Sequence, residues 1–315
     1  MFSLPTTDHQ PKEKMKSTAP ITANQKKTKI LITGATGATG GHAIIDLLRR
    51  NIPVRALVHK IDERSEKLRA QGVEIALGDI SDFESVTEAL KGITGAYFVF
   101  PITVPGIVEA TAFFAQTAIE QGVGAIVNMS QISARRVAKS HAARNHWIAE
   151  RLLDRSGIPV THLRPTFFAE WLMYQSKAIR EQNILPLPFG EARYAPIAAE
   201  DQGRVIGAIL SNPAGHAGKV YPLYGSKELT QFEIAEILSS ILGRNISYVA
   251  MEIEAFKPVL KEMGFTPYFI QHISAVAQDC RDGVFSGTND LVEKLTGQTP
   301  LSMADYIVKN QALFN

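Results

Sequence analysis

The chain has 315 residues, of which 45% are hydrophobic and 20% charged, so it is long enough for one large domain or two moderate ones. Its 33 basic and 31 acidic residues give a net charge of +2, which supplies no electrostatic reason to expect nucleic acid or an anionic membrane as a partner. A single cysteine, Cys280, excludes an internal disulfide and a thiolate metal cluster.

Residues 1–27 are polar and rich in proline, threonine and lysine, without the apolar core of a signal peptide, so we expect a flexible extension there. No apolar run approaches the ~20 residues of a membrane span. Together with the lone cysteine, these features favour a cytoplasmic protein.

From Lys29 onward, short aliphatic runs alternate with helical patterns. The aliphatic runs predict strands over residues 29–33, 53–58, 73–77, 95–100, 124–130 and 159–165. The segments between them predict helices over residues 40–51, 62–72, 82–92, 108–122 and 141–157. Such alternation builds parallel strands joined by right-handed helical crossovers. The fold class expected is therefore α/β, a doubly wound parallel sheet of the Rossmann type.

The pattern changes after Pro165, so we divide the chain into residues 28–165 and a smaller, mostly helical capping portion, 166–315, that adds late strands to the sheet. Its expected elements, in chain order, are an irregular segment over 183–197, a strand over 219–225, a helix over 230–245 with Thr230 as N-cap, and largely helical stretches over 254–264 and 268–289.

A glycine-rich run, GATGATGG, occupies residues 34–41 between the first strand and the first helix. In a doubly wound sheet this is where the diphosphate of a dinucleotide binds. We expect Gly34 and Gly37 to turn with positive φ, and Gly40 or Gly41 to keep a side chain away where helix meets strand. Main-chain N–H groups at the helix start would then face the anion. The residues expected at this loop are Gly34, Thr36, Gly37, Ala38, Thr39 and Gly40.

The end of the second strand reads LVHKIDER, with basic residues where an NAD-specific protein carries an acidic one. His59, Lys60 and Arg64 would suit the 2′-phosphate of NADP, so NADPH is expected in preference to NADH. Asp62 and Glu63 are expected to open the next helix, where acidic residues are favoured.

Four segments together resemble the NmrA-like family of atypical short-chain dehydrogenases/reductases. They are GATGATGG, the GD pair at 78–79, VNMSQ at 127–131 and SGIPVTHLRPTFFAEWL at 156–172. The resemblance extends from about Lys29 to KLTGQTPLSMADYI at 294–307. The family includes NAD(P)H-dependent quinone and azo-dye reductases, and redox sensors that bind NADP without evident turnover.

The resemblance implies positions for further site residues. Asp79 and Ile80 would lie near the adenine, and Phe98, Phe100 and Pro101 would line the ribose and nicotinamide. Ser130 would stand near the nicotinamide, and Phe167 and Phe168 would shape the substrate side.

The sequence departs from the wider superfamily at the helix after the fifth strand, which has no Tyr-x-x-x-Lys pair. His146 is the candidate proton donor there, and Glu150, four residues on, could orient it. Ser130 and Lys139 are the other catalytic candidates, and Arg164 is expected to be structural. No His or carboxylate cluster has the spacing of metal ligands, so no metal is expected.

Two functions fit these residues. The first is a reductase that transfers hydride from NADPH to an easily reduced small acceptor, such as a quinone or azo compound, which needs little proton assistance. The second is a redox sensor that binds NADP(H) and acts through a protein partner without turnover. For the reductase, the expected partner is a small-molecule substrate, with a homodimer left open.

Overall fold

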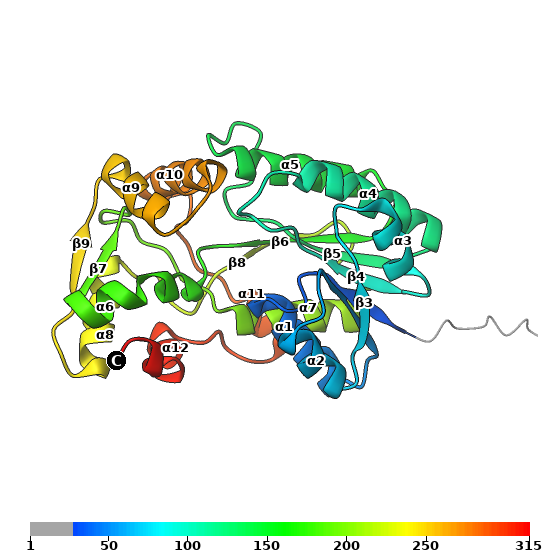
Figure 1. Ribbon diagram of the computed structural model, residues 1–315, viewed down its shortest axis with the longest axis horizontal. Helices are drawn as coiled ribbons and strands as arrows, with labels where there is room; N and C mark the ends of the chain where they lie inside the picture. Colours follow the sequence, from blue (N-terminus) through cyan, green and yellow to red (C-terminus); the bar gives the residue numbers. More distant parts are fainter. Residues whose placement is uncertain (1–27) are drawn as a thin grey trace, which may run out of the picture.

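The computed structural model describes residues 28–315, and the expected extension at 1–27 lies outside the described residues. Its centre is a seven-stranded sheet, parallel throughout, in the order β3-β2-β1-β4-β5-β6-β8 (Figure 1). The strands are β1 (Ile30–Ile32), β2 (Val54–Val58), β3 (Glu74–Leu77), β4 (Gly95–Phe98), β5 (Ala125–Met129), β6 (Val160–Pro165) and β8 (Val220–Leu223). The predicted α/β fold class is confirmed, and the order reverses between β1 and β4, where open parallel sheets bind ligands.

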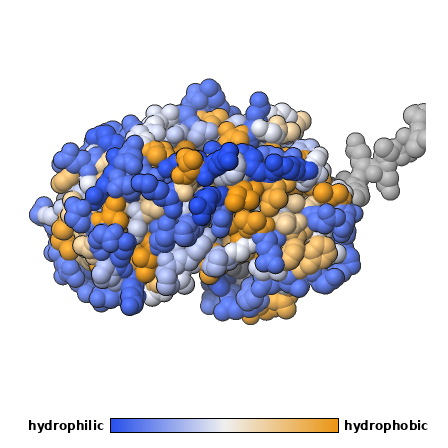
Figure 2. Space-filling model, turned by 90° about the horizontal axis from the view of Figure 1, so that it is seen from above, coloured by the Kyte–Doolittle hydropathy of each residue, from blue (hydrophilic) through white to orange (hydrophobic). Residues whose placement is uncertain are grey.

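Helices cover both faces of this sheet, as Figure 1 shows. One face carries α1 (Ala38–Arg49), α2 (Glu63–Ala70), α7 (Ala199–Ser211) and α11 (Leu291–Thr296). The other carries α3 (Phe83–Leu90), α4 (Ile107–Gln121) and α5 (His141–Asp154). Figure 2 looks down on the molecule from the α4–α5 side, where hydrophobic residues lie in separate groups among hydrophilic ones.

The helix starts follow the capping residues that the sequence supplies. Asp62 caps α2 by accepting the N–H groups of Arg64 and Ser65, and Glu63 is the first helical residue, as predicted. Thr230 caps α8 (Gln231–Leu242) in a capping box with Glu233, which confirms that prediction too.

The C-terminal cap packs beside the carboxyl ends of the sheet strands. It contains a small parallel pair, β7 (Ile184–Leu187) and β9 (Ser247–Ala250). Its helical elements are η1 (Ala169–Gln175), α6 (Ser176–Gln182), α8, α9 (Ile253–Glu262), α10 (Pro267–Arg281), α12 (Met303–Lys309) and η2 (Gln311–Leu313). Their apolar side chains form a core of their own.

One expectation for this half is wrong, and one needs a new boundary. The segment 183–197 was expected to be irregular, but its first part is β7, whose backbone pairs with β9. The stretch 268–289, expected to be largely helical, is helical as far as Arg281, where α10 ends at a turn formed by Asp282 and Gly283. Within residues 28–315, no helix is both long and apolar enough to cross a membrane.

Candidate active site

The glycine run forms a tight turn between β1 and α1. Gly34 has a φ of +59°, as expected, whereas Gly37 has a φ of −85° and is the extended N-cap of α1, so the positive φ expected there is wrong. A Cβ on Gly40 would lie 2.4 Å from the Gly34 carbonyl oxygen. Gly40 is therefore required by the close approach of helix and turn.

The start of α1 fits a diphosphate. Gly37 offers no side-chain cap, and the first turn of α1 holds no acidic residue. The first N–H groups of a helix have no partner within it, and the helix dipole makes this end positive. Main-chain donors at Ala38, Thr39 and Gly40 are thus available to an anion, which is the chemistry that a dinucleotide requires.

A cavity of about 740 Å³ begins at this turn and extends to the cap. The sheet side contributes residues at the carboxyl ends of β1 to β6, and the cap contributes residues from η1 and α10. The glycine loop residues named above all line it. In Figure 2 the outline is indented at its lower edge between the cap, at left, and the sheet half, at right.

His59, Asp79 and Ile80 line the cavity beyond the glycine loop. His59 Nδ1 lies 3.6 Å from the Asp79 carboxylate, and both side chains are well exposed. Lys60 and Arg64 are not among the residues that line the cavity, so their expected place beside a 2′-phosphate stays a prediction. Arg64 is instead paired with Asp62, the N-cap of its own helix, at 2.7 Å.

The end of β4 alternates between the cavity and the core. Phe100 and Pro101 line the cavity, as the resemblance implies, but Phe98 is fully buried against Phe114 on the other face, with ring centroids 4.7 Å apart. Successive strand residues face opposite sides of a sheet, so Val99 takes the lining position expected for Phe98.

His146 and Ser130 both line the cavity and are only 4% exposed. His146 Nδ1 and Ser130 Oγ are buried without a hydrogen-bond partner among the described residues. Burial, with a smaller contribution from the neighbouring His272, lowers the pKa of His146 to about 3. His146 is therefore neutral near pH 7, which disfavours its expected role as a proton donor.

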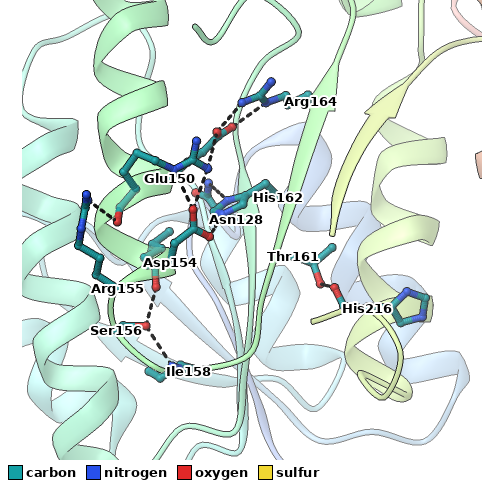
Figure 3. Close-up of polar contacts among 12 residues, drawn as sticks. Asn128, Glu150, Asp154, Arg155, Ser156, Ile158, Thr161, His162, Arg164 and His216 are labelled. Carbon is teal, nitrogen blue, oxygen red and sulfur yellow. Dashed lines mark hydrogen bonds and ion pairs between the residues drawn. The ribbon is translucent and has the colours of Figure 1, made fainter. Parts of the chain in front are cut away.

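Glu150 does not orient His146, because its carboxylate forms a bidentate pair with Arg164 at 2.8 and 2.5 Å (Figure 3). Arg164 thus has the structural role expected of it, neutralising a fully buried carboxylate. Next to this pair, His162 bridges Asn128 on β5 and Asp154 at the end of α5. The cluster ties α5 to β5 and β6.

Lys139 is exposed and does not line the cavity, so the structure does not bring it to the other catalytic candidates. Its backbone carbonyl instead accepts a hydrogen bond from Gln271 of α10, at 2.9 Å. Among the described residues, no group of three or more His, Cys, Asp or Glu is placed to hold a metal ion.

The end of the cavity beside the cap is aromatic. Phe167 and Phe168 line it as expected, and Phe167 stacks on Phe285 with centroids 4.5 Å apart. Trp171 of η1 stacks on Phe269 of α10 at 6.0 Å. These rings would receive a flat, apolar molecule.

The polar lining residues that the sequence did not indicate include Gln131 and His272. Gln131 directly follows Ser130, so its position after a strand was a usable signal. His272 lies on α10, far along the chain, and no local pattern indicates that it reaches the cavity.

Comparison with known proteins gives the same architecture. The model described as the NmrA-like family matches residues 26–298. An NAD(P)H azoreductase from Xenophilus azovorans is 29% identical over 287 residues, covering 90% of this chain and 99% of that protein. The structure of Escherichia coli NADPH-dependent quinone oxidoreductase with NADPH is 25% identical, with a TM-score of 0.80 over 91% of this chain and 100% of that one. Citrobacter sp. triphenylmethane reductase complexed with NADP(H), at 24% identity, shares the fold with a TM-score of 0.78 over 89% and 99% of the two chains.

Proposed function

Because this chain belongs to the NmrA-like family, we propose that it is an NADPH-dependent reductase of a small, easily reduced acceptor such as a quinone or an azo compound. The observation that carries the proposal is the continuous cavity, about 740 Å³, that joins the glycine loop to an aromatic acceptor end. The relatives named above as an azoreductase and a quinone oxidoreductase support the reaction class.

The cofactor end would hold the diphosphate at the start of α1 and the adenosine beside Asp79 and Ile80. The 2′-phosphate is expected beside the end of β2, where His59 lines the cavity. This basic side chain supports a preference for NADPH. Lys60 follows it and is exposed.

The acceptor end would hold a flat molecule against the rings of η1 and α10. Reduced nicotinamide, once bound, supplies a hydride, and a quinone that takes this hydride and one proton from water becomes a hydroquinone. The chain's own contribution is to bring donor and acceptor together and to exclude water, which can supply much of the rate.

Purified protein should bind NADPH in calorimetry and oxidise it, followed by absorbance, when a panel of quinones and azo dyes is added. Activity with at least one acceptor above the rate without protein is the expected result. Tight binding of NADPH with no oxidation by any acceptor would contradict the reductase and favour the sensor function.

A further inference from the structure

The acceptor end of the cavity contains hydrogen-bond donors that the proposed hydride transfer does not account for. Ser130 Oγ and Gln131 Nε2 are buried and lack a partner among residues 28–315. Both follow β5 directly, and His272 lines the same cavity from α10. Buried polar atoms are rarely left unpaired, so this arrangement indicates a ligand atom that pairs with them.

The orientation of Gln131 is set by its neighbour. Its Oε1 accepts the hydroxyl of Ser133 at 2.7 Å. That contact assigns the amide oxygen to Ser133 and leaves the NH₂ group as the free end. Gln131 therefore offers a donor to the cavity.

The tautomer of His272 follows from the hydrogen bonds that Ser140 makes. Ser140 Oγ accepts the N–H of Ala143 as the N-cap of α5 and lies 2.8 Å from His272 Nδ1. Ser140 is fully buried, so its hydroxyl proton is satisfied when it is donated to Nδ1. The ring proton then lies on Nε2, which makes His272 a neutral donor with a fixed ring.

These donors carry no formal charge. None of the described residues that line the cavity is a lysine or arginine. Burial lowers the pKa of His272 to about 4, so its imidazole is neutral near pH 7. An acceptor oxygen in this part of the site would thus meet dipoles and not a cation.

We propose that His272 Nε2, with Ser130 Oγ and Gln131 Nε2, binds the carbonyl oxygen of the acceptor and stabilises the negative charge that it gains on hydride transfer. This rests on the proposed reductase function and narrows its substrate to a neutral aromatic carbonyl compound, a quinone. Fixed donors aimed at a developing oxyanion act strongly in a site that excludes water. A neutral imidazole is a better match than an imidazolium because it polarises the carbonyl without the need to bury a charge.

The test compares two replacements of His272. His272→Asn keeps an acceptor near Nδ1 for Ser140 but removes the donor at Nε2, whereas His272→Gln places an amide donor near Nε2. With 1,4-naphthoquinone we expect kcat to fall about 100-fold in the Asn variant and by less than about 10-fold in the Gln variant. His141→Asn replaces an exposed histidine at the start of α5 and should change kcat by less than about twofold. An unchanged kcat in the Asn variant, or equal losses in Asn and Gln variants of wild-type stability, would overturn the proposal.

A second measurement does not depend on turnover. The protein loaded with NADP⁺ should bind 1,4-naphthoquinone without reaction, with quenching of Trp171 fluorescence as the signal. His272→Asn should weaken this Kd about 10-fold, the effect of one lost hydrogen bond, while the Gln variant stays near wild type. If the Asn variant binds naphthoquinone more weakly than the Gln variant but the wild type shows no turnover, the reductase function is refuted while the donor site is supported. No difference between the variants would overturn the donor site itself.

Discussion

Gly40 lies so close to the carbonyl oxygen of Gly34 that a side chain at residue 40 would collide with the glycine loop. In a Gly40→Ala variant the new Cβ would lie 2.4 Å from that oxygen and 3.1 Å from Ala35 Cα, both backbone atoms that cannot rotate away. The loop must shift, so we expect the Kd for NADPH in calorimetry to rise at least about 10-fold. Gly41→Ala is the control, because its Cβ would meet nothing closer than 3.8 Å. Equal affinities of the two variants would contradict this account of the loop.

The role of His59 in binding NADPH can be tested separately from those of Lys60 and Arg64. His59 lines the cavity, whereas Lys60 and Arg64 do not, and Arg64 is paired with Asp62. We expect His59→Ala to raise the Kd for NADPH about 10-fold and to change the Kd for NADH less, since only NADPH carries the 2′-phosphate. The Lys60→Ala, Arg64→Ala double variant should have the smaller effect on NADPH. A larger rise of the NADPH Kd in the double variant would show that Lys60 and Arg64, and not His59, bind the 2′-phosphate.

The two buried histidines make stability depend on pH. Burial holds the folded-state pKa of His146 at about 3 and of His272 at about 4, both below the ~6.5 of an unfolded chain. The unfolded state therefore binds more protons below pH 6.5, so the free energy of unfolding falls as pH drops from about 6.5 towards 4. At pH 5 each histidine should account for a loss of about 2 kcal/mol. Urea unfolding at pH 7 and 5 measures this, and His146→Asn should show a smaller loss than the wild type. A pH-independent midpoint over this range would contradict buried neutral histidines.

At the level of helices, α1 and α7 approach each other through glycines. A Cβ on Gly203 of α7 would lie 2.5 Å from His42 Cβ and 2.7 Å from the Ala43 nitrogen of α1. Gly203→Ala should therefore force the helices apart and lower the free energy of unfolding by about 2–3 kcal/mol, as overpacked cores do. Thermal unfolding measures the effect. Gly41→Ala, which adds a methyl to a helix without a close contact, should be neutral or slightly stabilising.

Local sequence signals decide which elements could be predicted. The run from β1 to β6 was predictable because each strand and each helix has its own hydrophobic period and capping residues. Helix α7 was not, since Gly203 and Gly207 lower its helix propensity and are favoured only by contact with α1. Strand β7 contains Pro186, which argues against a strand until β9, about 60 residues later, provides its partner.

For the whole molecule, the site divides into a part that the sequence specifies locally and a part that folding assembles. The glycine loop and the strand ends are contiguous in sequence with the elements that shape them, so their positions could be predicted, although Phe98 was assigned to the wrong face. His272 reaches the cavity only because α10 packs on α5, and Ser140 lies 132 residues away from it. Nor could the sequence show that Glu150 pairs with Arg164 and not with His146.

The assembled part depends on how the cap is joined to the sheet. Arg135, in the segment after β5, forms a bidentate pair with Asp279 of α10 at 2.9 and 2.5 Å. The Asp279 side chain is only 4% exposed, whereas that of Arg135 is 35% exposed. Removing the arginine leaves a buried carboxylate without a partner, while removing the carboxylate leaves a cation that water still reaches.

Arg135→Gln should consequently destabilise the protein by about 2–4 kcal/mol, and Asp279→Asn by less, because the loss of Coulomb energy is moderated by the exposure of Arg135. α10 also carries Phe269 and His272, so both variants should weaken naphthoquinone binding while the Kd for NADPH stays within about twofold. Arg193→Gln is the control, since its pair with Glu233 is exposed and should matter by less than about 1 kcal/mol. Calorimetry with each ligand and thermal unfolding provide the measurements. If NADPH and naphthoquinone affinities fell together, the cap would support the whole cavity and not the acceptor end alone.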